Sequence, residues 1–173
     1  SEGIHTNAMY GFLNIMFKFI DEEKPDYITV AFDLSEPTFR HKAYEAYKGT
    51  RKPMAPELKQ QVPLIKELLR MMNITVIEKA GYEADDIIGS IAHQHENDEY
   101  QIVVISSDKD LCQFVRDGHV HIFDAMKRKF MKEKDVLEKF GVPVNQVCDY
   151  LAIVGDTSDN IPGVPGVGPK TAM

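Results

Sequence analysis

Residues 155–172 read GDTSDNIPGVPGVGPKTA, a stretch that combines an acidic pair with a glycine-rich turn. Asp156 and Asp159 are spaced so that a helical turn would place both carboxylates on one face. The turn leads into Pro169, which suits the start of a helix because its missing N–H needs no partner there. Glycines before it let backbone N–H groups approach a phosphate closely. The stretch predicts a metal-binding face beside a helix-hairpin-helix element, which grips the nucleic-acid backbone; an acidic cap before a Pro/Gly loop is the structural alternative for the acid pair.

Strand and helix patterns alternate over the residues that precede this stretch. Buried strands are predicted at 27–32, 74–78 and 101–106, and a short hairpin at 119–123 and 129–131. Apolar periodicity predicts helices at 7–23, about 57–72, 81–96, 111–115, 133–140 and 145–154. Pro63 is expected to kink or break the second helix. This order predicts an α/β fold with a mostly parallel sheet flanked by helices.

Acidic residues follow the predicted strands directly. Because the carboxyl ends of parallel strands meet at one edge, where ligands bind, we expect a single acidic cluster there, completed from a later helix. Its members would be Asp33, Glu83, Asp85, Asp86, Asp108, Asp110, Asp156 and Asp159. All-oxygen ligation favours Mg²⁺ or Mn²⁺ over zinc. Two such ions about 4 Å apart can activate water for phosphodiester hydrolysis. Taken alone, the acids at 83–86 also fit the first turn of a helix, where the helix dipole favours them.

The segment between the first two strands, residues 34–56, is basic and aromatic. Tyr44, Tyr47, Lys48 and Arg51 would share one side of a helix. Such a surface suits single-stranded nucleic acid through stacking and phosphate contact, and a solvated amphipathic helix is the equally open alternative. We expect about 35–53 to be mobile without a ligand, because the segment is polar and lacks evident core contacts of its own.

Composition limits the classes of protein that remain. With 173 residues, 43% of them hydrophobic, the chain forms one domain or one domain with a small appendage. The net charge of −7 is unfavourable for binding DNA unless metal ions neutralise clustered acids beside a basic approach. No apolar run is long enough to span a membrane. Cys112 and Cys148 are expected to be buried free thiols in a reducing, cytoplasmic environment.

The motifs FRHKAYEAYKGTR (39–51), GYEADD (81–86), SSDKDL (106–111) and residues 155–172 together resemble the 5′-nuclease, or flap endonuclease, domain of bacterial DNA polymerase I. The resemblance covers nearly the whole chain. It implies a PIN-like (resolvase-like) nuclease core at 1–141, with a helical arch at about 35–53, and a helix-hairpin-helix subdomain at 142–173. It further implies a monomer that removes 5′ flaps and RNA primers from DNA with two Mg²⁺ or Mn²⁺ ions, next to a covalently linked polymerase domain.

The resemblance also assigns roles to residues. Glu83, Asp85, Asp86 and Asp108 would hold or orient one metal. Asp33 is the acid after the second family strand and is also a metal ligand by this resemblance. Asp110, Asp156 and Asp159 would hold the second metal. Lys48 and Arg51 match the basic pair that reaches the scissile phosphate, where Asp85 and Asp108 are also placed in the catalytic centre. Arg40 is a contact to the single strand. The duplex-binding hairpin, which in this family often holds K⁺, corresponds to Gly163, Gly166, Gly168 and Lys170.

The chain departs from the family pattern at both ends. Family members begin with a strand that ends in a metal-binding Asp, whereas these residues begin after it and stop at Met173, inside the hairpin. We expect a protein of these residues alone to bind metals poorly and to have little nuclease activity, unless they are part of a longer protein. A non-catalytic module that binds DNA structures is therefore the alternative function. An RNA-cutting nuclease of similar fold is a third, which the duplex-binding hairpin disfavours.

Overall fold

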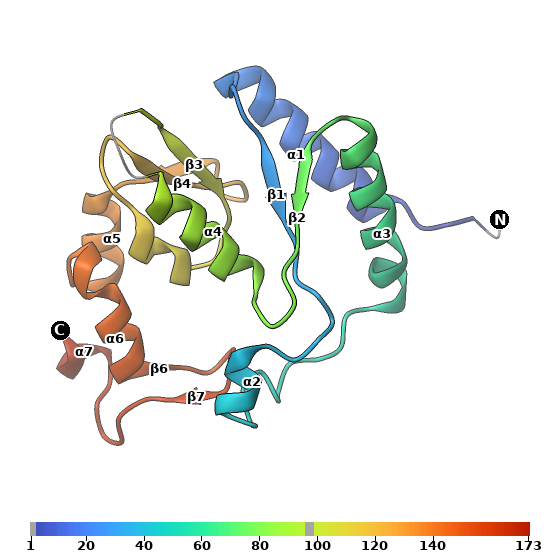
Figure 1. Cartoon of the computed structure of the whole chain (residues 1–173). Coiled ribbons are helices and arrows are strands. Elements are labelled where there is room, and N and C mark those ends of the chain that lie inside the picture. Colours follow the sequence, from blue (N-terminus) through green and yellow to red (C-terminus); the bar gives the residue numbers. More distant parts are fainter. Residues whose placement is uncertain (1–2, 96–98) are drawn as a thin grey trace. The chain divides into compact units, whose positions relative to one another are not determined.

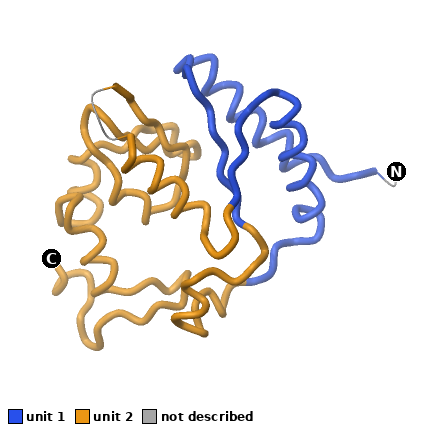
Figure 2. Tube along the Cα trace, viewed as in Figure 1, with its two compact units in different colours: residues 1–33, 52–78 blue, residues 34–51, 79–173 orange. Residues whose placement is uncertain are grey.

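The computed structural model describes residues 3–95 and 99–173, so the predicted helix end near Glu96 lies outside the described residues. The chain forms two compact units, which Figure 2 colours separately. Unit 1 comprises residues 1–33 and 52–78, and unit 2 comprises residues 34–51 and 79–173. Each unit takes up segments that are distant in sequence, and each has a hydrophobic core of its own.

Unit 1 consists of two helices beside a two-stranded parallel sheet (Figure 1). Its elements are α1 (Asn7–Glu23), β1 (Thr29–Ala31), α3 (Pro56–Met71) and β2 (Thr75–Ile77). Leu69 of α3 is fully buried and packs with Met16 of α1 and with Ile65. Four more apolar side chains of α1 pack against this core, and their spacing is the periodicity from which the helix was predicted, namely Met9, Phe12, Leu13 and Ile20. The apolar periodicity of α1 therefore identified the buried face correctly.

Two local features of unit 1 concern a proline inside one helix and the start of another. Helix α3 continues through Pro63, so a break there is excluded and a kink stays a prediction; losing one backbone hydrogen bond does not outweigh the burial of the apolar face of α3 against α1. Thr6 occupies the N-cap position of α1 but makes no side-chain cap. The buried Gln61 of α3 caps α1 instead, since its Oε1 accepts the N–H groups of Ala8 at 2.8 Å and Met9 at 3.2 Å.

Unit 2 contains a mixed three-stranded sheet, a short two-stranded hairpin and several helices (Figure 1). Its helices are α2 (Phe39–Ala43), α4 (Ala84–Gln94), α5 (Glu133–Phe140), α6 (Val147–Val154) and α7 (Pro169–Ala172), with 3-10 turns η1 (Asp110–Phe114) and η2 (Val144–Gln146). Its strands are β3 (Ile102–Ile105), β4 (Val120–Asp124), β5 (Lys129–Met131), β6 (Gly155–Asp156) and β7 (Ile161–Pro162). Strand β4 pairs in parallel with β3 and antiparallel with β5. The three strands predicted for one sheet are thus divided, with β1 and β2 in one ladder and β3 in another.

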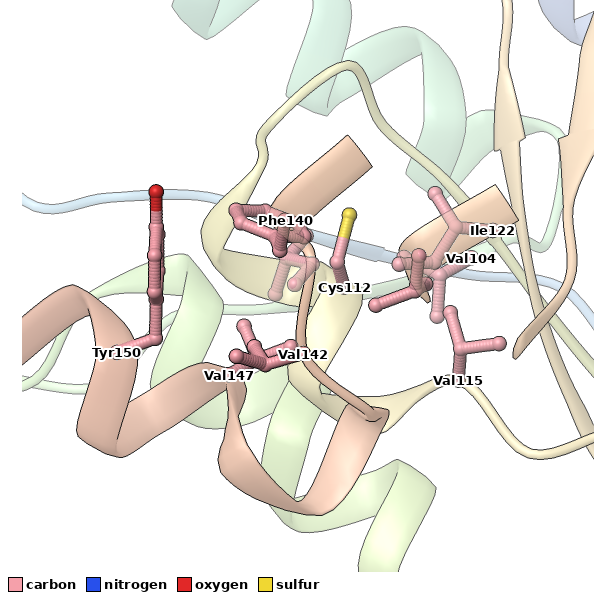
Figure 3. Close-up of a cluster of buried hydrophobic side chains, with 10 residues drawn as sticks. Val104, Cys112, Val115, Ile122, Phe140, Val142, Val147 and Tyr150 are labelled. Carbon is pink, nitrogen blue, oxygen red and sulfur yellow. The ribbon is translucent and has the colours of Figure 1, made fainter. Parts of the chain in front are cut away.

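The core of unit 2 lies among β3, β4, η1, α5 and α6 (Figure 3). Val115 and Val147 are fully buried there, and Phe140 meets Tyr150 edge to face at 5.8 Å between ring centroids. Cys112 is buried in this core, and burial raises the pKa of its thiol. Cys148 is exposed on α6, so its predicted burial was wrong. Among the described helices, none combines the length and the apolar character that a membrane crossing requires.

Candidate functional site

The basic segment after α2 does not continue as a helix. Helix α2 ends at Ala43, and Lys48 has a left-handed backbone with φ of 55°, which a helix cannot contain. The chain instead turns against the β6–β7 hairpin, where the Lys48 N–H donates to the Asp159 carbonyl at 2.8 Å. Asn160 Nδ2 donates to the Ala46 carbonyl at 2.8 Å. The predicted helical face from Tyr44 to Arg51 is therefore wrong, and so is the expectation that this segment lacks packing contacts.

Tyr47 is the central buried side chain of this turn, and sequence reasoning missed its role. Its ring is 6% exposed, and its hydroxyl lies 3.0 Å from Glu83 Oε2 and 3.1 Å from Asp159 Oδ2. Burial and the hydrogen bond to Glu83 raise the pKa of the phenol, which keeps it protonated. One hydroxyl proton thus serves two carboxylates that come from different parts of the chain. Aromatic spacing alone gave no signal of this contact.

The acids at the start of α4 are paired with basic side chains. Arg40 grips Asp86 with both terminal nitrogens, at 2.8 and 2.7 Å, and Lys48 Nζ lies 2.8 Å from Glu83 Oε1. The hydrogen bond from Arg40 lowers the pKa of Asp86. Asp86 also accepts the N–H of Glu83 at 2.9 Å, which caps α4. Asp85 lies in the same first turn, and its place in a metal site stays a prediction.

The loop after β3 presents two further acids. Its backbone is held by short-range bonds, in which Asp108 N–H donates to Ser106 Oγ at 3.0 Å and Asp110 N–H donates to Asp108 Oδ1 at 2.9 Å. Asp110 Oδ1 is buried and has no hydrogen-bond partner within the described residues. Burial, and then the charge of Asp108, raise the pKa of the Asp110 carboxyl. This oxygen is available to a cation.

Asp156 and Asp159 lie on the β6–β7 hairpin, so the predicted helical face is wrong for them. Gly155 adopts a positive φ of 79°, and a Cβ at position 163 would collide with the Val154 carbonyl. Because both positions accept only glycine without strain, the two glycines permit a hairpin where a helix was expected. Asp156 Oδ1 accepts the Ser158 N–H at 2.7 Å and the Ser158 hydroxyl. Burial raises the pKa of Asp156, but bonds from Lys109 and Ser158 outweigh it and lower that pKa to about 2.

Within unit 2 these residues line one cleft of about 510 Å³. Its walls are Arg51, Ser106, Ser107, Asp108, Lys109, Asp110, Asp156, Ser158 and Asp159. Lys109 Nζ lies 2.7 Å from Asp156 Oδ2, and Arg51 forms an ion pair with Asp159. Among the residues that line the cleft, four carboxylates thus face two cations.

The donor chemistry of the cleft fits a hard divalent cation, since its charged oxygens are carboxylates and one of them is buried with no hydrogen-bond partner among the described residues. In the described part of the chain, however, no three His, Cys, Asp or Glu side chains are grouped so as to hold an ion as they stand. Two of the cleft's carboxylates already carry ion pairs, Asp159 with Arg51 and Asp156 with Lys109. A metal ion at these two acids would therefore compete with basic side chains of the chain itself.

Two groups of predicted residues are not among those that line the cleft. Asp33 belongs to unit 1 and follows β1, where the Phe32 N–H donates to the Ile77 carbonyl at 3.0 Å; its meeting with the other acids stays a prediction. In the glycine-rich turn, Gly166 has a φ of 77° and Gly168 is the N-cap of α7. Pro169 is at the start of that helix, as predicted. Contacts of Gly163, Gly166, Gly168 and Lys170 with DNA or K⁺ stay predictions, as does the domain boundary after residue 141.

Comparisons with known proteins agree with this architecture. The family described as the N-terminal resolvase-like domain of 5′-3′ exonuclease matches residues 1–141, and its C-terminal SAM fold matches residues 142–173. DNA polymerase I of Caldicellulosiruptor bescii is 47% identical over 179 residues, which cover 100% of this chain and 21% of that protein. A 5′-3′ exonuclease of Aquifex aeolicus is 45% identical over 174 residues, which cover 100% of this chain and 60% of that protein.

A solved structure matches as well. The bacteriophage T5 flap endonuclease, in a pseudo-enzyme-product complex with DNA and metal ions, is 25% identical with a TM-score of 0.77. That match covers 98% of this chain and 67% of the phage protein. The chain spans about a fifth of the polymerase relative and three fifths of the exonuclease relative.

Proposed function

Because this chain belongs to the 5′-3′ exonuclease family, we propose that it hydrolyses DNA or RNA-primer phosphodiesters at 5′ flaps and 5′ ends, in a protein with a linked polymerase domain. The observation that carries the proposal is the cleft in which four carboxylates face two cations. The related proteins include a 5′-3′ exonuclease and a flap endonuclease in complex with DNA and metal ions, which supports the same activity. We further propose that the protein acts as a cytoplasmic monomer.

The acids would hold the ions in two groups. Asp110, Asp156 and Asp159 provide the oxygens of one site, and Glu83, Asp85, Asp86 and Asp108 provide those of the other, together with Asp33. The ions, when bound, supply an activated water and stabilise charge on the attacking and leaving oxygens. Carboxylate oxygen ligation favours Mg²⁺ or Mn²⁺ over zinc for this role. A K⁺ ion at the turn of Gly163–Gly168 is a separate proposal that rests on the resemblance of that turn.

Lys48 and Arg51 have two roles in this proposal, first as ion-pair partners of acids and then as contacts to the scissile phosphate. Each is bound to an acid of the cluster, Lys48 to Glu83 and Arg51 to Asp159. Once cations bind the acids, these side chains can turn to the scissile phosphate and stabilise the charge that develops in the transition state. Arg40, whose side chain is 34% exposed beside Asp86, can contact the single strand in the same way. Positioned cations of this kind lower the barrier because they need no reorganisation during the reaction.

The test is a cleavage assay on a 5′-flap DNA with Mg²⁺ or Mn²⁺, comparing the parent with Asp156→Ala. We expect the variant to lose at least about a hundredfold in cleavage rate while it retains duplex binding. Asp149→Ala, an exposed acid on the neighbouring α6, is the matched control and should cleave at the parental rate. Unchanged behaviour of Asp156→Ala relative to the parent, with duplex binding intact, would favour a non-catalytic DNA-binding module.

A further inference from the structure

Lys109 occupies a special position in the cleft. It stands in the loop after β3, between Asp108 and Asp110, and reaches across to the β6–β7 hairpin. There its Nζ lies 2.7 Å from Asp156 Oδ2, while the other oxygen of that carboxylate is held by Ser158. Lys109 therefore joins two segments that each carry acids of the cleft.

The backbone of Lys109 is fixed, whereas its ammonium group can move. Its backbone is held on both sides, by the bonds from Asp108 N–H to Ser106 and from Asp110 N–H to Asp108. The side chain is 39% exposed, whereas that of Asp156 is 11% exposed. A flexible four-carbon stem on a fixed base lets the ammonium leave the carboxylate for solvent without a change in the fold. Asp156 cannot leave in this way, because Ser158 holds its other oxygen.

The charges of the cleft show why such a cation is useful. Four carboxylates, from Asp108, Asp110, Asp156 and Asp159, face Lys109 and Arg51, so two negative charges remain. Without Lys109, three would remain in a cleft that already holds a buried and unpartnered oxygen of Asp110. A divalent ion that binds Asp156 Oδ2 competes with the ammonium, because two cations in contact with one oxygen repel each other.

We propose that Lys109 is a tethered counter-ion: it holds Asp156 in position in the metal-free protein and competes with a divalent cation for that carboxylate. The proposal rests on the proposed function, since it assumes that the cleft binds such a cation. Lys109 is a positioning residue in this scheme, because it acts through Asp156. Lys109 stabilises the metal-free cleft and lowers its affinity for a divalent cation. Added salt screens the attraction between Lys109 and Asp156 and so weakens this competition.

The test is Mn²⁺ binding at low ionic strength, measured by calorimetry and by the electron paramagnetic resonance of free Mn²⁺, for the parent, Lys109→Met and Lys109→Arg. Lys109→Met keeps the stem and loses the charge, so we expect about fivefold tighter binding. Lys109→Arg keeps the charge and should bind within about twofold of the parent. The advantage of Lys109→Met should shrink in high salt. Thermal unfolding in a chelator checks folding, and Lys109→Met should melt slightly below the parent there.

Asp156→Asn separates the two ideas. If the parent binds Mn²⁺ and Asp156→Asn weakens that binding, the cleft binds metal, and the effect of Lys109→Met then decides the role of Lys109. Binding by Lys109→Met that is equal to or weaker than that of the parent would overturn the counter-ion role and leave the proposed function intact. A parent that binds no Mn²⁺, or binds it independently of Asp156, would overturn both.

Discussion

Two acidic regions of unit 2 differ in how their charge is balanced. At the start of α4, at least two of the three acids are paired with basic side chains, Glu83 with Lys48 and Asp86 with Arg40. In the cleft, four carboxylates face two cations, and one Asp110 oxygen is buried without a hydrogen-bond partner in the described residues. An ion at Glu83 and Asp86 would have to compete with those basic side chains, whereas the cleft retains net negative charge that a divalent ion can neutralise directly. The comparison shows that the number of acids alone does not define a metal site, because basic side chains of the chain itself compete for the same oxygens.

The largest effect is expected from Lys48→Ala. If Lys48 only balances Glu83, its loss lowers stability and leaves the cleavage rate of the folded protein unchanged. If Lys48 also stabilises the transition state, the rate on a 5′-flap DNA should fall by about a hundredfold at saturating metal. We expect the second result, measured as single-turnover rates. The exposed Lys134→Ala on α5 is the control and should match the parent. Parental rates for Lys48→Ala would restrict that residue to charge balance.

Tyr47→Phe tests the bond that links the two regions, since the hydroxyl meets Glu83 in one and Asp159 in the other. Two buried carboxylates would each lose a hydrogen-bond donor, so the free energy of unfolding should fall by about 2 kcal/mol. Urea denaturation in the presence of a chelator measures this change. Tyr10→Phe, on a ring that is 68% exposed in unit 1, should change it by less than about 0.5 kcal/mol. Equal values for the two variants would mean that the hydroxyl does not tie the regions together.

Asp86→Asn tests the balanced region, and a smaller loss of about 1 kcal/mol is expected because the Arg40 pair is partly exposed. The pKa of Asp86 is lowered in the folded protein, so its contribution is present above the unfolded pKa of about 4 and is lost as the pH falls below it. Denaturation from pH 8 to pH 3 should show a constant difference between parent and variant down to about pH 4, and then convergence. A difference that grows in acid would contradict the ion pair.

Asp110→Asn should give the smallest effect and the opposite sign. The pKa of Asp110 is raised, so its ionised form costs stability above that raised pKa, and the cost is relieved as the pH falls through it. In a chelator at pH 7 the variant should therefore be more stable by less than about 1 kcal/mol, with no advantage at pH 4. Adding Mn²⁺ should reverse the order, because the parent alone gains the full stabilisation by metal. A less stable variant at pH 7 would mean that this acid is already balanced.

Some predictions from the sequence were correct and others were wrong, and each outcome has a physical cause. The α1 stripe was predicted because apolar spacing reports a helix face directly. The burial of Cys148 was predicted wrongly, because its apolar neighbours on α6 occupy the other sides of that helix. The pair at 156 and 159 was placed on a helix by its spacing, but Gly155 and Gly163 made a hairpin possible there. Spacing is therefore a weaker guide where glycines permit several backbone paths.

Most helices and strands up to residue 154, and the family, were readable from the linear chain, because periodicity, turn residues and motif order are local properties. The ion pairs were not readable in this way. Tyr47 and Asp159 are 112 positions apart, and Lys48 and Glu83 are 35 apart. Such partners meet only after the basic turn has packed on the β6–β7 hairpin, and a left-handed Lys48 within that turn has no clear signal in sequence. The charge balance of the cleft is therefore decided by the tertiary structure, because only the folded chain brings each basic side chain to its carboxylate.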